Sequence, residues 1–215
     1  MKIVSINVGL PRKVVFKGQE VLTGIFKETV QHRVSLRKLN LDSDRQADLT
    51  VHGGPDKAVY AYPSEHYEYW RHQLPGIELP WGMFGENFTT EGLLEDMVNI
   101  GDEFQIGSAK VMVTQPRMPC YKLGIKFGRT DIIRRFLVSG RSGFYFRVLQ
   151  EGEVGAGDAI EPISRDKNNI AIKDIIRLYV HDKQDIETLR RAAQLEPLPE
   201  GWREYFLQQI ERLGK

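Results

Sequence analysis

The sequence predicts a mainly β fold, a barrel or a sandwich with a few peripheral helices, followed by a small bundle of three helices. Short apolar runs separated by glycine and proline dominate the first 164 residues, a pattern typical of many short strands joined by turns. From about residue 165 onward, apolar residues recur at helical spacing instead. We therefore expect two domains, residues 1–164 and residues 165–215.

Alternation and turn signals mark the expected strands. Residues 30–38 alternate between two faces, which predicts one strand partly open to solvent. Residues 104–113 predict a hairpin, because a two-residue connection that contains glycine separates two alternating runs. A Gly-Asp pair precedes an apolar run at 99–104 and again at 156–160, and each phrase predicts a turn that leads into a strand.

Two helices are expected within the β-rich region. Ser64 can cap a helix that runs through residues 65–71, and Thr130-Asp131 can cap one over residues 132–137 that ends at a glycine. Neither helix lies in a repeating strand–helix–strand rhythm, which argues against a doubly wound parallel sheet.

Three amphipathic helices are expected after residue 165. Apolar side chains follow helical spacing over residues 172–179, 186–193 and 202–213. A bundle of this size must bury its apolar face against the β domain or against a second subunit. Basic and acidic residues are nearly balanced in this region, whereas a DNA-binding helix should show a basic face, so the bundle is not expected to bind nucleic acid.

Composition excludes several classes of partner. The 215 residues include 30 basic and 29 acidic side chains, for a formal net charge of +1, so no global field attracts nucleic acid or an anionic membrane. No stretch approaches the roughly 18 apolar residues of a membrane span, and no signal-peptide core is visible at the start. A single cysteine cannot form an internal disulfide. We expect a soluble protein of the reducing cytoplasm.

Cys120 is the first candidate for chemistry. Pro116 and Pro119 each fix a φ angle around it, and the nearby Arg117 favours the thiolate, which is the form that attacks electrophiles or binds a soft metal. A single cytosolic cysteine is also often a small buried hydrophobic residue. The motif alone does not separate a nucleophile, a metal ligand and a buried residue.

A second motif is His52-Gly53-Gly54-Pro55-Asp56-Lys57. It is either an ordinary turn between two strands or an anion site, in which two adjacent glycines let backbone N–H groups approach the anion closely. In the second interpretation, the histidine and the lysine add donors or charge. The spacing of a P-loop is absent.

A third motif is the glycine-punctuated aromatic stretch from Trp81 to Phe88. Most such stretches are loops packed against a core. Glu86 and Asn87 would also offer acceptors and amide donors to a heterocycle that carries both kinds of edge group. Other sites are not expected, because the sequence lacks the His-Glu-x-x-His and Gly-x-Ser-x-Gly patterns and has too few cysteines for a structural zinc site.

The three motifs, in this order and spacing, resemble the signature of MOSC-domain proteins, specifically those of the YiiM type. They read Val51-His52-Gly53-Gly54-Pro55-Asp56-Lys57-Ala58, then Phe84-Gly85-Glu86-Asn87, then Gln115-Pro116-Arg117-Met118-Pro119-Cys120-Tyr121-Lys122-Leu123. The YiiM type also ends in a small three-helix domain, which corresponds to residues 165–215. The resemblance therefore runs almost end to end, and it implies a β-barrel for the first domain.

The resemblance implies that the protein binds the molybdenum cofactor, molybdopterin with molybdenum. Cys120 would be the catalytic residue and would supply a thiolate to the metal. The positions implied to line the pterin and its phosphate are Lys27, His52, Gly53, Gly54, Asp56, Lys57, Phe84, Glu86, Asn87 and Arg117. Pyridoxal phosphate binding is a further keyword attached to the family.

The activity implied by the resemblance is reduction of small N-hydroxylated compounds, such as bases of the 6-hydroxylaminopurine type, to amines, with a role in their detoxification. Reduced molybdenum would take the oxygen from the N–OH group, releasing amine and water. The chain shows no dinucleotide fingerprint and no iron–sulfur cysteine cluster, so a separate flavin- or iron–sulfur-type reductase would deliver electrons. The alternative is a carrier of the cofactor, or of its sulfur, without turnover. Association of two copies of the chain into a homodimer is a further expected possibility for its partners.

Overall fold

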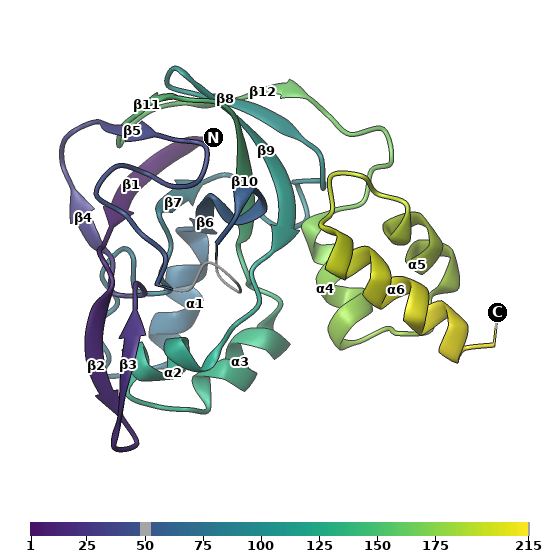
Figure 1. Cartoon of the computed structure of the whole chain (residues 1–215), viewed down its shortest axis with the longest axis horizontal. Helices are drawn as coiled ribbons and strands as arrows, with labels where there is room; N and C mark the ends of the chain where they lie inside the picture. The colour runs from purple at the N-terminus through teal and green to yellow at the C-terminus, as the bar shows by residue number, and fades with distance from the viewer. Residues whose placement is uncertain (48–52, 215) are drawn as a thin grey trace.

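The computed structural model describes residues 1–47 and 53–214, and a mixed eight-stranded sheet forms its centre (Figure 1). The strands are β1 Lys2–Val8, β2 Arg12–Phe16, β3 Gln19–Thr23, β4 Glu28–Val30, β5 Val34–Leu36, β6 Val59–Pro63, β7 Phe88–Glu91, β8 Glu103–Ile106, β9 Ala109–Pro116, β10 Phe144–Gln150, β11 Gly152–Val154 and β12 Ile160–Ser164. The large sheet has the order β12-β8-β9-β10-β6-β7-β1-β4. Only β6 and β7 run parallel within it. Two further pairs, β2-β3 and β5-β11, flank it.

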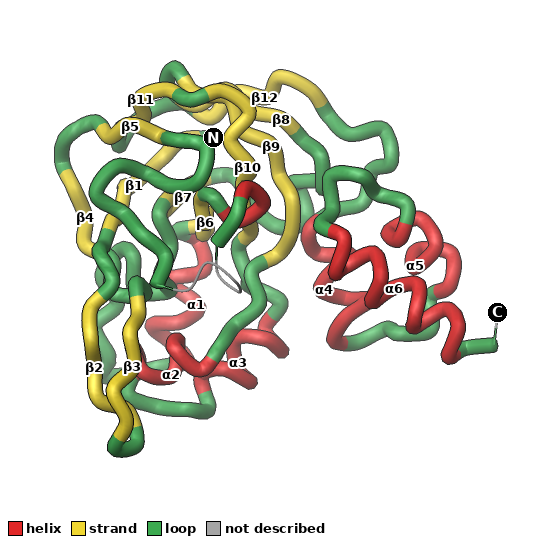
Figure 2. Tube along the Cα trace, in the orientation of Figure 1, coloured by secondary structure: helices red, strands yellow, loops and turns green. Residues whose placement is uncertain are grey.

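The helices form two groups, below the sheet and beside it in the view of Figure 2. The first group is α1 Glu65–Gln73, α2 Tyr121–Phe127 and α3 Ile132–Ser139, and the second is α4 Ile172–Val180, α5 Ile186–Ala193 and α6 Glu200–Arg212. A single 3₁₀ turn, η1 Pro55–Lys57, precedes β6. None of the helices in the described ranges has both the length and the apolarity that crossing a bilayer requires.

The large sheet curls but does not close. The start of β1 meets the segment before β12, where Lys2 and Ala159 form an isolated bridge and the amide of Ile160 donates to the carbonyl of Met1 at 3.0 Å. The edge strands β4 and β12 are nevertheless not paired with each other. The closed barrel expected from the resemblance is therefore not confirmed. The described residues show a mixed, sheet-dominated fold with six α-helices.

Local signals predicted several strands correctly. The hairpin is β8-β9, with Ile106 opposite Ala109, and the two Gly-Asp phrases lead into β8 and β12 as expected. The single strand expected over residues 30–38 is wrong, because β4 pairs with β1 whereas β5 pairs with β11 in another sheet. The chain bends between them, and Arg33 in the bend forms an ion pair with Asp158 at 2.8 Å.

Both helices expected in the β-rich region are present, and so are all three at the C-terminus. Neither Ser64 nor Asp131 makes the expected capping hydrogen bond through its side chain. The sequence-based prediction missed α2, a seven-residue helix that begins directly after Cys120. Gly128 ends α2 with φ 64°, in the left-handed region that glycine adopts at low cost.

The terminal bundle is docked on the β domain. Buried side chains of α4, α5 and α6, among them Ile175, Leu189 and Phe206, belong to the same hydrophobic cluster as the interior of the large sheet. A second cluster packs α1 and α3 against the loop before β7 and is rich in aromatic rings. The rings of Tyr62 and Phe84 stack there with centroids 4.6 Å apart.

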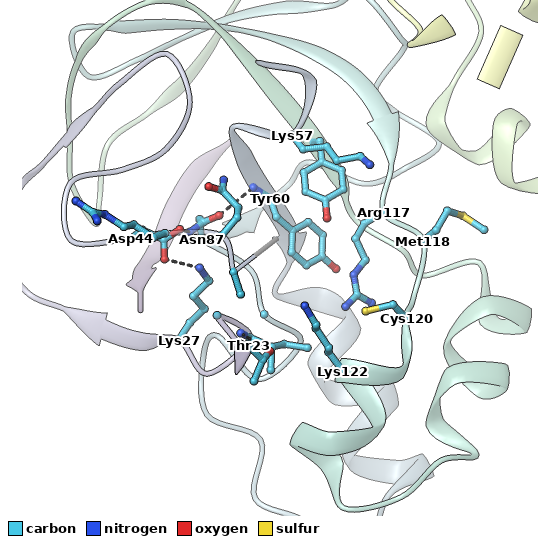
Figure 3. Close-up of a pocket in the computed structure, with 17 residues that line it drawn as sticks. Thr23, Lys27, Asp44, Lys57, Tyr60, Asn87, Arg117, Met118, Cys120 and Lys122 are labelled. Carbon is cyan, nitrogen blue, oxygen red and sulfur yellow. Dashed lines mark hydrogen bonds and ion pairs between the residues drawn. The ribbon is translucent and has the colours of Figure 1, made fainter. Parts of the chain in front are cut away.

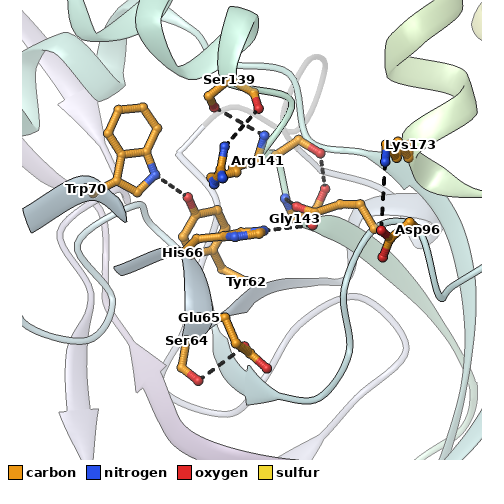
Figure 4. Close-up of polar contacts among 12 residues, drawn as sticks. Tyr62, Ser64, Glu65, His66, Trp70, Asp96, Ser139, Arg141, Gly143 and Lys173 are labelled. Carbon is orange, nitrogen blue, oxygen red and sulfur yellow. Dashed lines mark hydrogen bonds and ion pairs between the residues drawn. The ribbon is translucent and has the colours of Figure 1, made fainter. Parts of the chain in front are cut away.

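A buried polar network joins this aromatic cluster to the end of β9, and Figure 4 shows the part of it around His66 and Gly143. His66 Nε2 lies 2.7 Å from one carboxylate oxygen of Glu95, whose other oxygen accepts from the Gly143 amide at 2.7 Å. The Gly143 carbonyl in turn accepts from the Arg117 amide at 3.2 Å. Gly143 has φ 60°, and a Cβ there would lie 2.3 Å from the carbonyl oxygen of Ala61, so only glycine fits. The network fixes the backbone of Arg117.

Candidate functional site

Cys120 lies where two cavities meet. It occupies the N-cap position of α2 with an extended backbone, φ −123° and ψ 172°, and it lines both a cavity of about 100 Å³ and a wider groove of about 680 Å³. Lys57, Met118 and Tyr145 also line both. A ligand bound in either cavity would therefore lie beside the Cys120 thiol.

Basic side chains dominate the smaller cavity, which we call the basic cavity. Its charged lining residues among the described ones are Lys27, Arg45, Lys57, Arg117 and Lys122, with Asp44 as the carboxylate. Such an excess of one sign in a concave site concentrates the opposite charge. The basic cavity is therefore suited to an anionic ligand.

Arg117 is a buried residue of the basic cavity with an unsatisfied hydrogen-bond donor among the described residues. The residue is 5% exposed, and its Nη1 makes no hydrogen bond with any described residue. Its guanidinium lies 4.9 Å from the ring centroid of Phe136 and 5.4 Å from that of Tyr60. Figure 3 shows it turned toward the same space as the side chains of Cys120 and Lys122. A buried guanidinium with an unpaired donor is costly unless an anion binds it.

Asp44 positions two other residues that line the basic cavity, Lys27 and Asn87. One of its oxygens pairs with Nζ of Lys27, and the other accepts from Nδ2 of Asn87 at 2.9 Å. Burial lowers the pKa of Lys27, and Asp44 opposes that shift. Asn87 also accepts from the Tyr60 amide at 3.2 Å. The polar atoms of Lys27 and Asn87 are thus committed to neighbours, and both residues shape the cavity.

Glu86 and Phe84, expected to line the ligand site, border neither the basic cavity nor the wider groove, and both are fully buried. The Glu86 carboxylate accepts hydrogen bonds from the amides of Gly82 and Phe84, at 2.8 Å and 3.0 Å, and from the hydroxyls of Tyr67 and Thr89. Burial raises its pKa. Glu86 therefore folds the loop before β7, which places the neighbouring Asn87 on the cavity wall.

The glycine-rich motif lines the wider groove. Gly53, Gly54, Asp56 and Lys57 all border it, but the Asp56 carboxylate is engaged by Arg147, with Nε 2.7 Å from Oδ1. Burial lowers the pKa of Lys57. His52 lies outside the described residues.

Several lining residues were missed by sequence reasoning. Lys122 lies in the first turn of α2, so missing that helix also hid this residue. Tyr145 comes from β10, which pairs with β9 opposite Gln115, and burial raises its pKa while Arg117 opposes that shift. Asp44 lies in an irregular segment without a motif, so no local signal pointed to it.

The wider groove has an aromatic wall that comes from the terminal bundle, and we call it the aromatic groove. Tyr179 of α4 and Trp202 and Tyr205 of α6 line it together with Cys120. Sequence reasoning expected these side chains to pack the bundle and to dock it on the β domain or on a second subunit, and did not expect them to line a groove beside Cys120.

Comparison with known proteins identifies the family. A MOSC domain model matches residues 48–161, and a YiiM-like 3-alpha helix domain model matches residues 170–213. The chain is a MOSC-domain protein of the YiiM type.

Relatives agree over most of this MOSC chain. The uncharacterized protein YflK of Bacillus subtilis (strain 168) is 41% identical over 98% of the chain and 95% of its own length, and the protein YiiM of Escherichia coli (strain K12) is 36% identical over 84% and 81%. A reductase of Gibberella moniliformis is 29% identical over 83% of the chain, which spans 32% of that longer protein. The crystal structure of YiiM from Geobacillus stearothermophilus superposes with a TM-score of 0.82 at 38% identity, covering 97% and 98% of the two chains.

Proposed function

We propose that this MOSC-domain protein binds the molybdenum cofactor, with the Cys120 thiolate as a ligand of molybdenum, and reduces N-hydroxylated compounds to amines. Bases of the 6-hydroxylaminopurine type are the substrates that we infer. The observation that carries the proposal is the buried guanidinium of Arg117, whose Nη1 lacks a partner among the described residues, in a basic cavity that Cys120 also lines.

The residues present fit the cofactor in charge and in ligand chemistry. Arg117 and Lys122 can hold the phosphate group, because both are buried and face the basic cavity. A thiolate is a soft donor that suits molybdenum, and a metal-bound thiol is deprotonated. The basic cavity, at about 100 Å³, is small beside the roughly 300–1,000 Å³ of most ligand sites. We therefore assign it to the phosphate-bearing end, with Cys120 at its boundary.

The reaction that we propose is R–NHOH + 2e⁻ + 2H⁺ → R–NH₂ + H₂O, in which the N–O bond breaks and nitrogen is reduced. When bound, the cofactor supplies the two electrons, which an external flavin- or iron–sulfur-type reductase replaces. Lys57 lies on the wall shared by both cavities and its pKa is lowered by burial. Its Nζ is our candidate for delivering a proton to the substrate, because it lies on that shared wall.

Family membership and the reductase from Gibberella moniliformis support an oxidoreductase. That relative is only distantly similar, and its name specifies no substrate. Pyridoxal phosphate binding and a role in detoxification have no support from the site, and the proposal does not include them.

The test is reduction of 6-hydroxylaminopurine to adenine by protein purified from a host that makes the cofactor. A reduced viologen dye can serve as electron donor, so that the partner reductase is not needed. We expect turnover that disappears in Cys120→Ser. Stoichiometric cofactor without turnover, with several electron donors, would instead support the carrier function.

A further inference from the structure

We propose that Tyr179, Trp202 and Tyr205 form a stacking platform for planar heterocyclic substrates, so that the terminal three-helix domain determines substrate selectivity. This inference rests on the proposed function for the site of reaction at Cys120. The binding of a planar base, however, can be measured without turnover, so the two proposals can fail separately.

The first observation is the composition of the aromatic groove. The β domain contributes Cys120, Met118 and Lys57 to its lining, and the helices contribute the three aromatic side chains. At about 680 Å³ the groove has the volume of a typical small-molecule site. A substrate that lies on the helices therefore borders the thiol directly.

The second observation is that these rings remain half-buried although they belong to one cluster. The ring centroids of Tyr179 lie 5.4 Å from Trp202 and 5.2 Å from Tyr205. The neighbouring Phe206, by contrast, is fully buried and packs the bundle interior. Large apolar groups that stay accessible in a concave site are typical of ligand contacts, since core packing alone would bury them.

The third observation is that the platform is held in place relative to the β domain. The Trp202 indole Nε1 donates to Oε1 of Gln115 at 3.0 Å, and Gln115 is in β9, which leads to Cys120. Because the indole is already fixed, a planar ligand loses less free energy in ordering it. Aromatic side chains with fixed orientation stack on any base, since every base has a π face.

Other ligands fit the aromatic groove less well. An aliphatic hydroxamic acid has no extended π face and would gain little from the rings, although its N–OH group could still reach Cys120. Both classes of compound carry the N–OH group that is reduced, but only the planar bases carry a ring that can stack. The platform therefore predicts that the protein prefers planar bases to aliphatic N-hydroxylated compounds.

The experiment compares the wild type with Trp202→Ala, Tyr205→Ala and Trp202→Phe, and uses Leu207→Ala as the control. Leu207 also lies on α6 but is 51% exposed and does not line the aromatic groove. The KM is measured for 6-hydroxylaminopurine and for acetohydroxamic acid, beside the molybdenum content. Adenine binding to each variant is measured by calorimetry, and thermal unfolding shows whether each variant is folded.

We expect Trp202→Ala and Tyr205→Ala to raise the KM for 6-hydroxylaminopurine and the Kd for adenine about tenfold, the order expected for loss of one stacking contact. The KM for acetohydroxamic acid should stay within twofold. Trp202→Phe keeps a stacking ring but loses the hydrogen bond to Gln115, so it should raise the Kd for adenine less than Trp202→Ala does. Equal effects on both substrates, or unchanged adenine affinity in folded alanine variants, would overturn the inference. Adenine binding that depends on Trp202 in a protein without turnover would support the platform while the proposed reaction fails.

Discussion

The indole Nε1 of Trp202 donates a hydrogen bond of 3.0 Å to Oε1 of Gln115, although 87 positions separate the two residues. Gln115 lies near the end of β9, two residues before Arg117 and five before Cys120. The bond therefore ties α6 to the segment that carries the basic cavity. It gives the terminal bundle a fixed position at the site.

The bond predicts a small loss of stability when only the donor is removed. Trp202→Phe keeps a ring but leaves Oε1 of the buried Gln115 without this donor, so the free energy of unfolding should fall by about 1 kcal/mol. Urea denaturation measures it, with Trp81→Phe as the control, since no hydrogen bond of the Trp81 indole is found in the described part of the chain. Equal losses in both variants would argue against a specific role for the bond.

Arg117→Met should weaken anion binding. Inorganic phosphate stabilises a protein that binds it, so the melting temperature of the wild type should rise with phosphate concentration at constant ionic strength. Without the buried guanidinium, that rise should fall by at least half. Arg134→Met, which removes an exposed arginine from α3, is the matched control and should respond like the wild type. A full phosphate response in Arg117→Met would contradict the assignment of the basic cavity.

Glu86→Gln separates folding of the loop from ligand binding. Glutamine keeps one acceptor oxygen, so its NH2 group would face the amide of either Gly82 or Phe84, which bond to different carboxylate oxygens, and the free energy of unfolding should fall by about 2 kcal/mol or more. Phosphate affinity should change less than threefold, because Glu86 is fully buried. Glu91→Gln, on the exposed end of β7, serves as the control. Loss of phosphate binding in a stable Glu86→Gln protein would restore Glu86 as a ligand contact.

Lys126 predicts a specific pH dependence of stability. Burial lowers its pKa to about 8 from the usual 10.5, and its Nζ donates to the carbonyls of Ile25 and Gly82 at 3.1 Å and 2.6 Å. Between these two pKa values the unfolded chain binds more protons than the folded one, so stability rises with pH. Relative to Lys126→Met, the wild type should gain about 2 kcal/mol between pH 7.5 and 9.5.

Urea denaturation at several pH values measures this difference, since the titration of all other groups is shared by the two proteins. A difference that stays flat from pH 7.5 to 9.5 would show that the pKa of Lys126 is not lowered in the folded state.

The sequence predicted those parts of the fold that local signals determine. The β8-β9 hairpin and the terminal helices follow from alternation, turn residues and helical spacing, all within a few positions. The break between β4 and β5 was not predicted, because each strand is completed by a partner distant in sequence, β1 and β11 respectively. Short helices such as α2 depend mainly on packing, and their periodicity is too short to recognise.

The candidate site, like the fold, was predictable only where a local sequence signal marked the residue. The ordered motifs pointed to Lys57, Asn87, Arg117 and Cys120, and the family resemblance added Lys27; all five line one cavity in the structure. They could not show that the Glu86 side chain turns inward, because the four donors that it binds come together only in the folded loop. Nor could they show the aromatic wall, which requires the docking of the terminal bundle against β9.

Binding of the molybdenum cofactor at Cys120 is tested by the molybdenum and pterin content of the purified protein, measured by elemental analysis and by fluorescence of the oxidised pterin. Expression is compared in a host that makes the cofactor and in one that cannot, with Cys120→Ser beside the wild type. We expect molybdenum near one per chain that depends on the host pathway and is lost in Cys120→Ser. Absence of molybdenum and pterin from the wild type in both hosts would contradict cofactor binding.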